Sequence, residues 1–180
     1  ERVTVAYGQG MSSTSLQLVA AINVIANGGI YVAPKLVKAT VGPDGKQTPM
    51  PSAASHRVVS ERAAAQTTAM MQRVVCEGTA TRAQVGNLPI AGKTGTAFKA
   101  ADNGTYFNAN GQRIYYASFV GFFPADNPQI TILVSVDEPP AGTNDRFGGT
   151  AAAPVFAALV PTLLHERNIQ PAPGSRGCPE

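Results

Sequence analysis

Ile90-Ala91-Gly92-Lys93-Thr94-Gly95-Thr96-Ala97 is the stretch that decides the fold of this chain. We interpret it as most of a strand over residues 90–98, and two further strands are predicted over residues 115–123 and 129–137. The connection Pro124-Ala125-Asp126-Asn127-Pro128 is short and turn-like, so the second and third strands should form an antiparallel hairpin. The stretch therefore begins a three-stranded antiparallel sheet.

The third predicted strand, Ile130-Thr131-Ile132-Leu133-Val134-Ser135-Val136, is apolar almost throughout. A strand that is buried on both faces has this pattern, whereas a half-exposed strand alternates. We therefore expect it to be a central strand. That position requires further strands on its far side, which this chain does not contain.

Helices are predicted on either side of the strands along the chain. Ser12 and Ser13 offer N-cap hydroxyls for a helix over residues 12–27, which Asn27-Gly28-Gly29 would end. A second helix should begin at Ser60 and run to about Cys76. Its predicted apolar face comprises Ala64, Met70, Met71, Val74 and Val75.

A final apolar helix is predicted over residues 151–167. Helices that flank an antiparallel sheet give an α+β fold. We expect one domain over residues 1–170, followed by a flexible tail of proline and glycine over residues 171–180.

Composition excludes several classes of protein. The net charge of +3 is small and scattered, which argues against a nucleic-acid partner. No apolar run approaches the ~18–20 residues needed to span a bilayer. His56 and His165 are isolated, and no metal site is predicted. Cys76 and Cys178 have no metal-ligand spacing, so we favour two separate thiols, with a disulfide as the alternative.

Gly92-Lys93-Thr94 resembles the end of a phosphate-binding loop, which would indicate a nucleotide-binding protein. That loop requires a glycine at position 87, where the chain has asparagine; Gly86 lies one residue too early. The nucleotide interpretation is therefore disfavoured.

The whole chain resembles class B penicillin-binding proteins, especially the division-type peptidoglycan transpeptidases. The resemblance rests on segments in the family's order. These are Tyr7-Gly8-Gln9-Gly10-Met11, Asn27-Gly28-Gly29-Ile30-Tyr31, the Lys-Thr-Gly-Thr stretch, Phe119-Val120-Gly121-Phe122-Phe123-Pro124-Ala125 and Phe147-Gly148-Gly149-Thr150-Ala151-Ala152-Ala153-Pro154-Val155-Phe156. It implies a β-lactamase/transpeptidase-like fold, present here as a partial domain.

The resemblance implies a serine acyltransferase that acts on D-Ala-D-Ala stem peptides of peptidoglycan, is acylated by β-lactam antibiotics and uses no cofactor. Lys93 and Thr96 would be catalytic, with the Thr96 N–H in the oxyanion hole. Lys93, Thr94, Gly95 and Thr96 would bind substrate. Possible cleft residues are Tyr115, Tyr116, Arg146 and Phe147. Because Tyr115 and Tyr116 are adjacent in a strand, only one of them can face the cleft.

The family's nucleophile motif, Ser-x-x-Lys, is missing, since no serine of this chain has a lysine three residues later. We therefore expect the chain to be the carboxyl-terminal half of a transpeptidase domain, inactive alone. Its partners would be the missing amino-terminal half and proteins of cell division or elongation. The location would be the extracytoplasmic face of the bacterial cell membrane, with the anchor outside this chain. The alternative is a penicillin-binding sensor or inactive homologue that binds without turnover.

Overall fold

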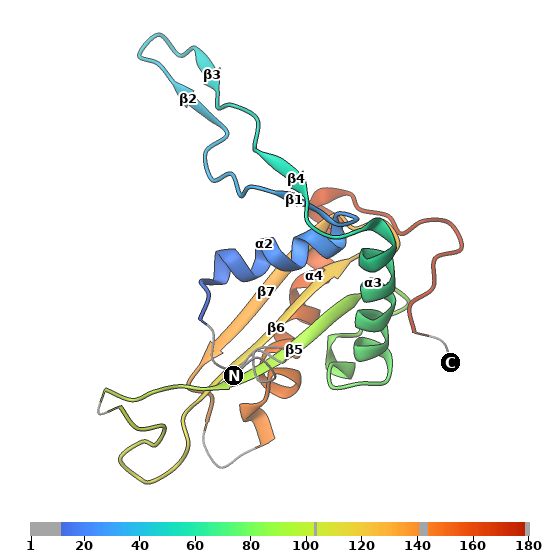
Figure 1. Cartoon of the computed structure of the whole chain (residues 1–180). Helices are drawn as coiled ribbons and strands as arrows, with labels where there is room; N and C mark the ends of the chain where they lie inside the picture. The colour runs from blue at the N-terminus through green and yellow to red at the C-terminus, as the bar shows by residue number, and fades with distance from the viewer. Residues whose placement is uncertain (1–11, 103, 141–143, 179–180) are drawn as a thin grey trace.

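A three-stranded antiparallel sheet forms the centre of the computed structural model, which describes residues 12–102, 104–140 and 144–178. Its strands are β5 (Ala91–Phe98), β6 (Tyr115–Phe123) and β7 (Ile130–Asp137), in the order β5-β6-β7 (Figure 1). The register pairs Gly95 with Ser118, and Ser118 with Ser135. The predicted strands and the β6–β7 hairpin are confirmed to within one residue at each end.

Within the described sheet β6 is the central strand, and β7 pairs with β6 alone. Most of β6 is buried, whereas β7 is half-buried and lies at an edge of the described sheet. Within the described residues, helix α2 packs on β7 and helix α4 supplies core residues against Ile132 and Val134. Further strands beyond β7 stay a prediction.

Three helices surround the sheet: α2 (Ser15–Ala26), α3 (Glu61–Cys76) and α4 (Ala153–Arg167). The N-cap of α3 is Ser60, as predicted, and its hydroxyl accepts from Ala63 N at 3.1 Å. Helix α2 begins later than predicted, with Thr14 as its N-cap. Thr14 forms a reciprocal capping box with Gln17, which an N-cap at Ser12 or Ser13 would lack.

The two faces of the sheet bury different side chains. On one face, Phe119 and Phe123 of β6 pack edge-to-face against Phe156 of α4, and all three are fully buried. On the other face, Phe122 clusters with Met71 of α3 and with apolar residues of α2. Met70 belongs to the predicted apolar face of α3, but it is 61% exposed, so the buried face of that helix is narrower than predicted.

The last helical segment contains a π-helical turn, η3 (Gly148–Ala152), that leads directly into α4. Together they form a 20-residue segment, Gly148–Arg167, that is long and apolar enough to cross a membrane by length and composition alone. Phe156 and Val160 of this segment are fully buried in the core. Val155 and Leu159 are exposed, so packing on the sheet accounts for one face of the segment.

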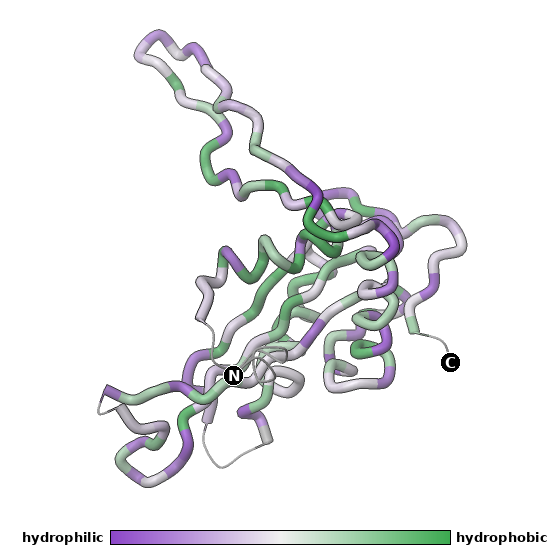
Figure 2. Tube along the Cα trace, viewed as in Figure 1, coloured by the Kyte–Doolittle hydropathy of each residue, from purple (hydrophilic) through white to green (hydrophobic). Residues whose placement is uncertain are grey.

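A two-stranded ribbon projects from the end of α2 and returns to the start of α3 (Figure 1). It is built from β1 (Ile30–Val32) paired with β4 (Ser55–Arg57), and β2 (Ala39–Val41) paired with β3 (Gln47–Pro49). The turn Pro43-Asp44-Gly45 forms its tip, where Gly45 N donates to Gly42 O at 2.9 Å. The sheet and the ribbon differ in hydropathy: β6 and β7 are mostly hydrophobic, whereas the tip of the ribbon is mostly hydrophilic (Figure 2).

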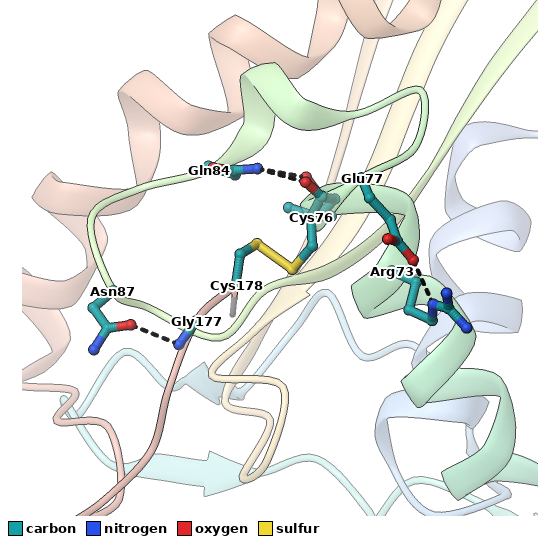
Figure 3. Close-up of a disulfide and its surroundings, with 8 residues drawn as sticks. Arg73, Cys76, Glu77, Gln84, Asn87, Gly177 and Cys178 are labelled. Atoms are coloured by element: carbon teal, nitrogen blue, oxygen red, sulfur yellow. Dashed lines mark hydrogen bonds and ion pairs between the residues drawn. A yellow bond between two sulfur atoms is a disulfide. The ribbon is translucent and has the colours of Figure 1, made fainter. Parts of the chain in front are cut away.

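Cys76 and Cys178 form a disulfide, with their Cα atoms 5.1 Å apart, so the favoured assignment of two separate thiols is wrong (Figure 3). Hydrogen bonds support the link. Gly177 N donates to Asn87 Oδ1 at 2.9 Å, and Gln84 Nε2 donates to Cys76 O at 3.2 Å. The C-terminal segment is thus attached to the end of α3 and to the loop before β5. The spacing of the cysteines in the sequence does not indicate this disulfide, because the two residues are 102 positions apart.

Candidate active site on the edge strand β5

The backbone of β5 presents alternate residues to the edge of the sheet. Lys99 N donates to Ile114 O at 3.0 Å, which extends the β5–β6 ladder one pair beyond Phe98 and Tyr115. Hydrogen-bonded positions alternate along an antiparallel strand. Residues 93, 95 and 97 therefore bond to β6, and the N–H and C=O groups of Thr94 and Thr96 are directed away from it. This orientation is the one that an oxyanion donor at Thr96 requires.

The ammonium group of Lys93 lies at the same edge. The side chain is exposed, and its Nζ donates to the backbone O of Thr94 at 2.8 Å. Because that carbonyl points out from the edge, the lysine side chain is drawn towards the edge of the strand. The ammonium of Lys93 and the outward-directed N–H of Thr96 thus lie at the same edge of one strand, only a few residues apart.

The hydroxyls of Thr94 and Thr96 share one face of β5, as the alternation of strand side chains predicts. Thr94 Oγ1 lies 2.7 Å from Thr79 Oγ1, and Thr96 Oγ1 accepts from Gly148 N at 3.2 Å. The Thr96 hydroxyl keeps its own proton available for donation, because it is the acceptor in this contact. Thr79 belongs to no motif recognised in the sequence, whereas Gly148 lies in the segment 147–156 that carries the family resemblance, where no role was assigned to it.

Gly95 lies between the two threonines, and a side chain at this position would point to the opposite face of β5. A Cβ at this position would lie 2.5 Å from Ser118 Oγ. That face also carries an open groove of about 950 Å³ between the amino-terminal end of α2 and the sheet. Its lining includes Gly95, Thr96, Tyr106, Tyr116, Ser118 and Asp137.

The predicted cleft residues divide between the two faces. Tyr116 lines the groove, whereas Tyr115 contacts Phe147 on the other face with ring centroids 6.2 Å apart. The Arg146 guanidinium lies over both of these rings, 5.5 Å from Tyr115 and 5.0 Å from Phe147. The two adjacent tyrosines thus lie on opposite faces of β6, as the alternation of strand side chains predicts, and which of them faces the ligand stays a prediction. Tyr115, Arg146 and Phe147 form a single aromatic and cationic cluster.

Lys99 lies at the end of the groove and joins β5 to the end of β7. Its Nζ contacts Asp137 Oδ2 at 2.7 Å and Glu138 Oε1 at 2.8 Å. Two hydrogen bonds raise the pKa of Lys99 above its ordinary value, the one to Asp137 more than the one to Glu138. A lysine whose pKa is raised by folding stabilises the folded state fully at every pH below the pKa that it has in the unfolded chain. The contribution of Lys99 to the free energy of unfolding is therefore constant around neutral pH. Among the described residues, no group of acidic, histidine or cysteine side chains is arranged to hold a metal ion.

Gly148 packs directly on the backbone of the site. A Cβ there would lie 2.1 Å from Ser118 O and 2.6 Å from Gly95 O. These contacts explain why the loop into η3 approaches closely enough for Gly148 N to reach the Thr96 hydroxyl.

We expect Gly148→Ala to lower the free energy of unfolding by about 1–3 kcal/mol, the usual cost of overpacking. The backbone of either β5 or the η3 turn has to move to accept the methyl group. Denaturant unfolding measures the change. Gly45→Ala is the control, because a Cβ at Gly45 meets nothing within 4 Å and its cost comes only from the positive φ of 77°. An alanine at 148 that costs no more than the one at 45 would contradict the close packing.

The chain matches a known protein family. The family model of the penicillin-binding protein transpeptidase domain matches residues 1–160. The chain belongs to this family. The described part of the match contains β5, the Thr79 loop, Gly148 and α4 as far as Val160, and the fold class predicted from the sequence is confirmed. The segment Tyr7-Gly8-Gln9-Gly10-Met11, used in the sequence comparison, lies outside the described residues.

Individual relatives of this transpeptidase domain agree with the family match. The chain is 39% identical to stage V sporulation protein D of Bacillus subtilis over 173 residues, which cover 95% of the chain and 26% of that protein. It is 34% identical to peptidoglycan D,D-transpeptidase FtsI of Escherichia coli over 172 residues, covering 95% of the chain and 26% of FtsI. The chain therefore spans about a quarter of the length of these relatives.

A solved structure has the same fold. Penicillin-binding protein 3 from Mycobacterium tuberculosis, in complex with aztreonam, superposes with a TM-score of 0.79 at 33% identity. The match covers 98% of this chain and 40% of that one. The chain is thus similar to part of a protein that binds a β-lactam.

Proposed function

We propose that this chain supplies one wall of a peptidoglycan D,D-transpeptidase site. The observation that carries the proposal is the edge of β5, where the Lys93 ammonium and the outward-facing backbone of Thr96 occur together. The reaction is acyl transfer. A serine hydroxyl attacks the amide carbonyl between two D-alanines, an ester to the serine forms, and the terminal D-alanine leaves. The amine of a neighbouring stem peptide then takes the acyl group and releases the serine.

Each residue of the β5 edge has a role in this proposal. The Thr96 N–H stabilises the oxyanion, because it is directed outwards from the edge of β5. Lys93 places a positive charge near the substrate carboxylate and the proton network of the serine. The hydroxyls of Thr94 and Thr96 donate to the carboxylate. A β-lactam is accepted because it presents a reactive amide carbonyl and a carboxylate in the same relation.

The nucleophile and the general base come from a region outside this chain. We propose that it carries Ser-x-x-Lys and Ser-x-Asn and folds against the β5 edge. The fragment alone is then inactive, because it has no activated serine. The proposed location is the extracytoplasmic side of the bacterial membrane, where peptidoglycan lies. Division or elongation proteins are the proposed protein partners.

A penicillin-binding sensor is the second candidate of the same fold, since acylation without turnover needs the same oxyanion donor and carboxylate contacts. Turnover of a stem peptide separates the two. The nucleotide interpretation is not supported by the fold, because Gly92-Lys93-Thr94 lies within strand β5 rather than in a loop that opens a helix.

Intact mass after incubation with benzylpenicillin tests the proposal. The measurement is made on this 180-residue chain and on a longer polypeptide that contains it. We expect one adduct of the drug's mass on the longer polypeptide and none on the chain alone. An adduct on the chain alone would reveal a nucleophile within it and contradict the divided site. No adduct on either would refute a penicillin-reactive function.

A further inference from the structure

We propose that Thr79 is a positioning residue that directs the hydroxyl proton of Thr94 towards the substrate carboxylate. The inference rests on the function proposed above and adds a residue from outside the β5 edge. Thr79 lies in the loop between α3 and the 3₁₀ turn η1 (Thr81–Ala83), 15 residues before its partner. The two hydroxyl oxygens are 2.7 Å apart, which is the ordinary length of an O–H···O hydrogen bond.

The backbone that carries Thr79 is held in place by close packing. Ala80, the next residue, is fully buried, and its N–H donates to Val74 O at 3.1 Å. Gly149 lies against the other side, where a Cβ would be only 2.0 Å from Thr79 O. A Cβ at Gly78 would lie 2.8 Å from the backbone of Val74. The Thr79 hydroxyl is therefore presented from a fixed backbone rather than from a free loop.

The direction of the shared hydrogen bond decides what Thr94 can do. A threonine hydroxyl has one proton and two acceptor positions. If Thr79 donates to Thr94 Oγ1, the Thr94 proton is left for a third group. A carboxylate that approaches this proton favours that direction, and each hydrogen bond of such a chain strengthens the next. Thr79 thus acts through Thr94 and has no need to touch the substrate.

This arrangement makes the effect of Thr79 depend on the negative charge of the ligand. A hydroxyl chain that ends on a carboxylate loses strength when its first donor is removed. A ligand whose carboxylate is masked as an ester has no such charge to stabilise. A purely structural role of Thr79 would affect both ligands equally, since both need the same fold and the same oxyanion hole.

The test compares benzylpenicillin with its methyl ester on the longer polypeptide, with the second-order rate constant of acylation as the readout. We expect Thr79→Val to slow acylation by the acid by about three- to tenfold, the size of one lost hydrogen bond, and acylation by the ester by less than twofold. Valine keeps the β-branched shape and removes only the hydroxyl. Thr79→Ser retains a hydroxyl and should restore the acid-to-ester ratio of the wild type.

A double-mutant cycle with Thr94→Val completes the test, because residues that act through each other are not additive. Thr79→Val should have no further effect on the acid once Thr94 lacks its hydroxyl. Equal slowing of acid and ester, or full additivity with Thr94→Val, would overturn the role of Thr79 while leaving the proposed function intact. A wild-type polypeptide that neither ligand acylates would overturn both.

Discussion

Lys93→Ala is expected to slow acylation of the longer polypeptide by benzylpenicillin by about 10- to 100-fold, since hydrogen bonds to charged groups contribute about 1.5–3 kcal/mol. The ammonium lies at the edge of β5 through its contact with Thr94 O. In the proposed site, it is the positive charge that attracts the ligand carboxylate and stabilises the negative charge around the serine. Its loss should therefore reduce both binding and the acylation step.

The rate of adduct formation, followed by intact mass at several drug concentrations, separates these two contributions. Lys38→Ala is the matched control, because it removes the same charge from the exposed ribbon, outside the site. Lys93→Arg tests whether charge alone is sufficient. Equal rates for Lys93→Ala and the wild type would contradict the proposed role of the β5 edge.

Removal of the disulfide is the second large effect that we expect. The Cys76→Ser, Cys178→Ser double variant should lose about 2–4 kcal/mol of free energy of unfolding, the usual contribution of a disulfide that closes a long loop. The link closes a separation of 102 residues, so its main effect is to restrict the unfolded chain. In the folded state, residues 170–178 should exchange amide hydrogens faster, since the segment is then held by hydrogen bonds such as those of Gly177 to Asn87 and of Ser175 to Asp126, without a covalent link.

Denaturant unfolding of the longer polypeptide measures the loss, and hydrogen exchange locates it. Arg73→Ala serves as the control at the same end of α3, because it removes only the exposed ion pair with Glu77, for which about 0.2–0.5 kcal/mol is expected. A double-serine variant no less stable than this control would contradict the structural role of the disulfide. So would free thiols in the wild type that iodoacetamide alkylates without prior reduction.

Long segments with a clear pattern were predictable from the sequence. The Ser60 cap and Cys76 end of α3 follow from a serine before an acidic first turn and a glycine soon after the last turn. The placement of Thr94 and Thr96 on one face needs only the two-residue period of a strand. These predictions depend on interactions between residues that are close in sequence, which is why they hold.

Features set by distant contacts were not predictable in the same way. The apolar run in β7 indicated burial, but which elements cover it depends on distant contacts: among the described residues it pairs with β6 alone and is covered by α2 and α4. The ribbon strands have three residues each, too few to show alternation. The Thr79–Thr94 contact joins a loop to a strand, and no local pattern marks it.

The central claim is that the outward-facing N–H of Thr96 binds the carbonyl oxygen of the acyl group. The hydroxyls of Thr94 and Thr96 bind the carboxylate of the same ligand. A crystal structure of the longer polypeptide acylated by benzylpenicillin tests it most directly. We predict the ester carbonyl oxygen at about 2.7–3.1 Å from Thr96 N, and the ligand carboxylate within hydrogen-bonding distance of both threonine hydroxyls. An acyl-enzyme whose carbonyl oxygen and carboxylate both lie away from β5 would contradict the account.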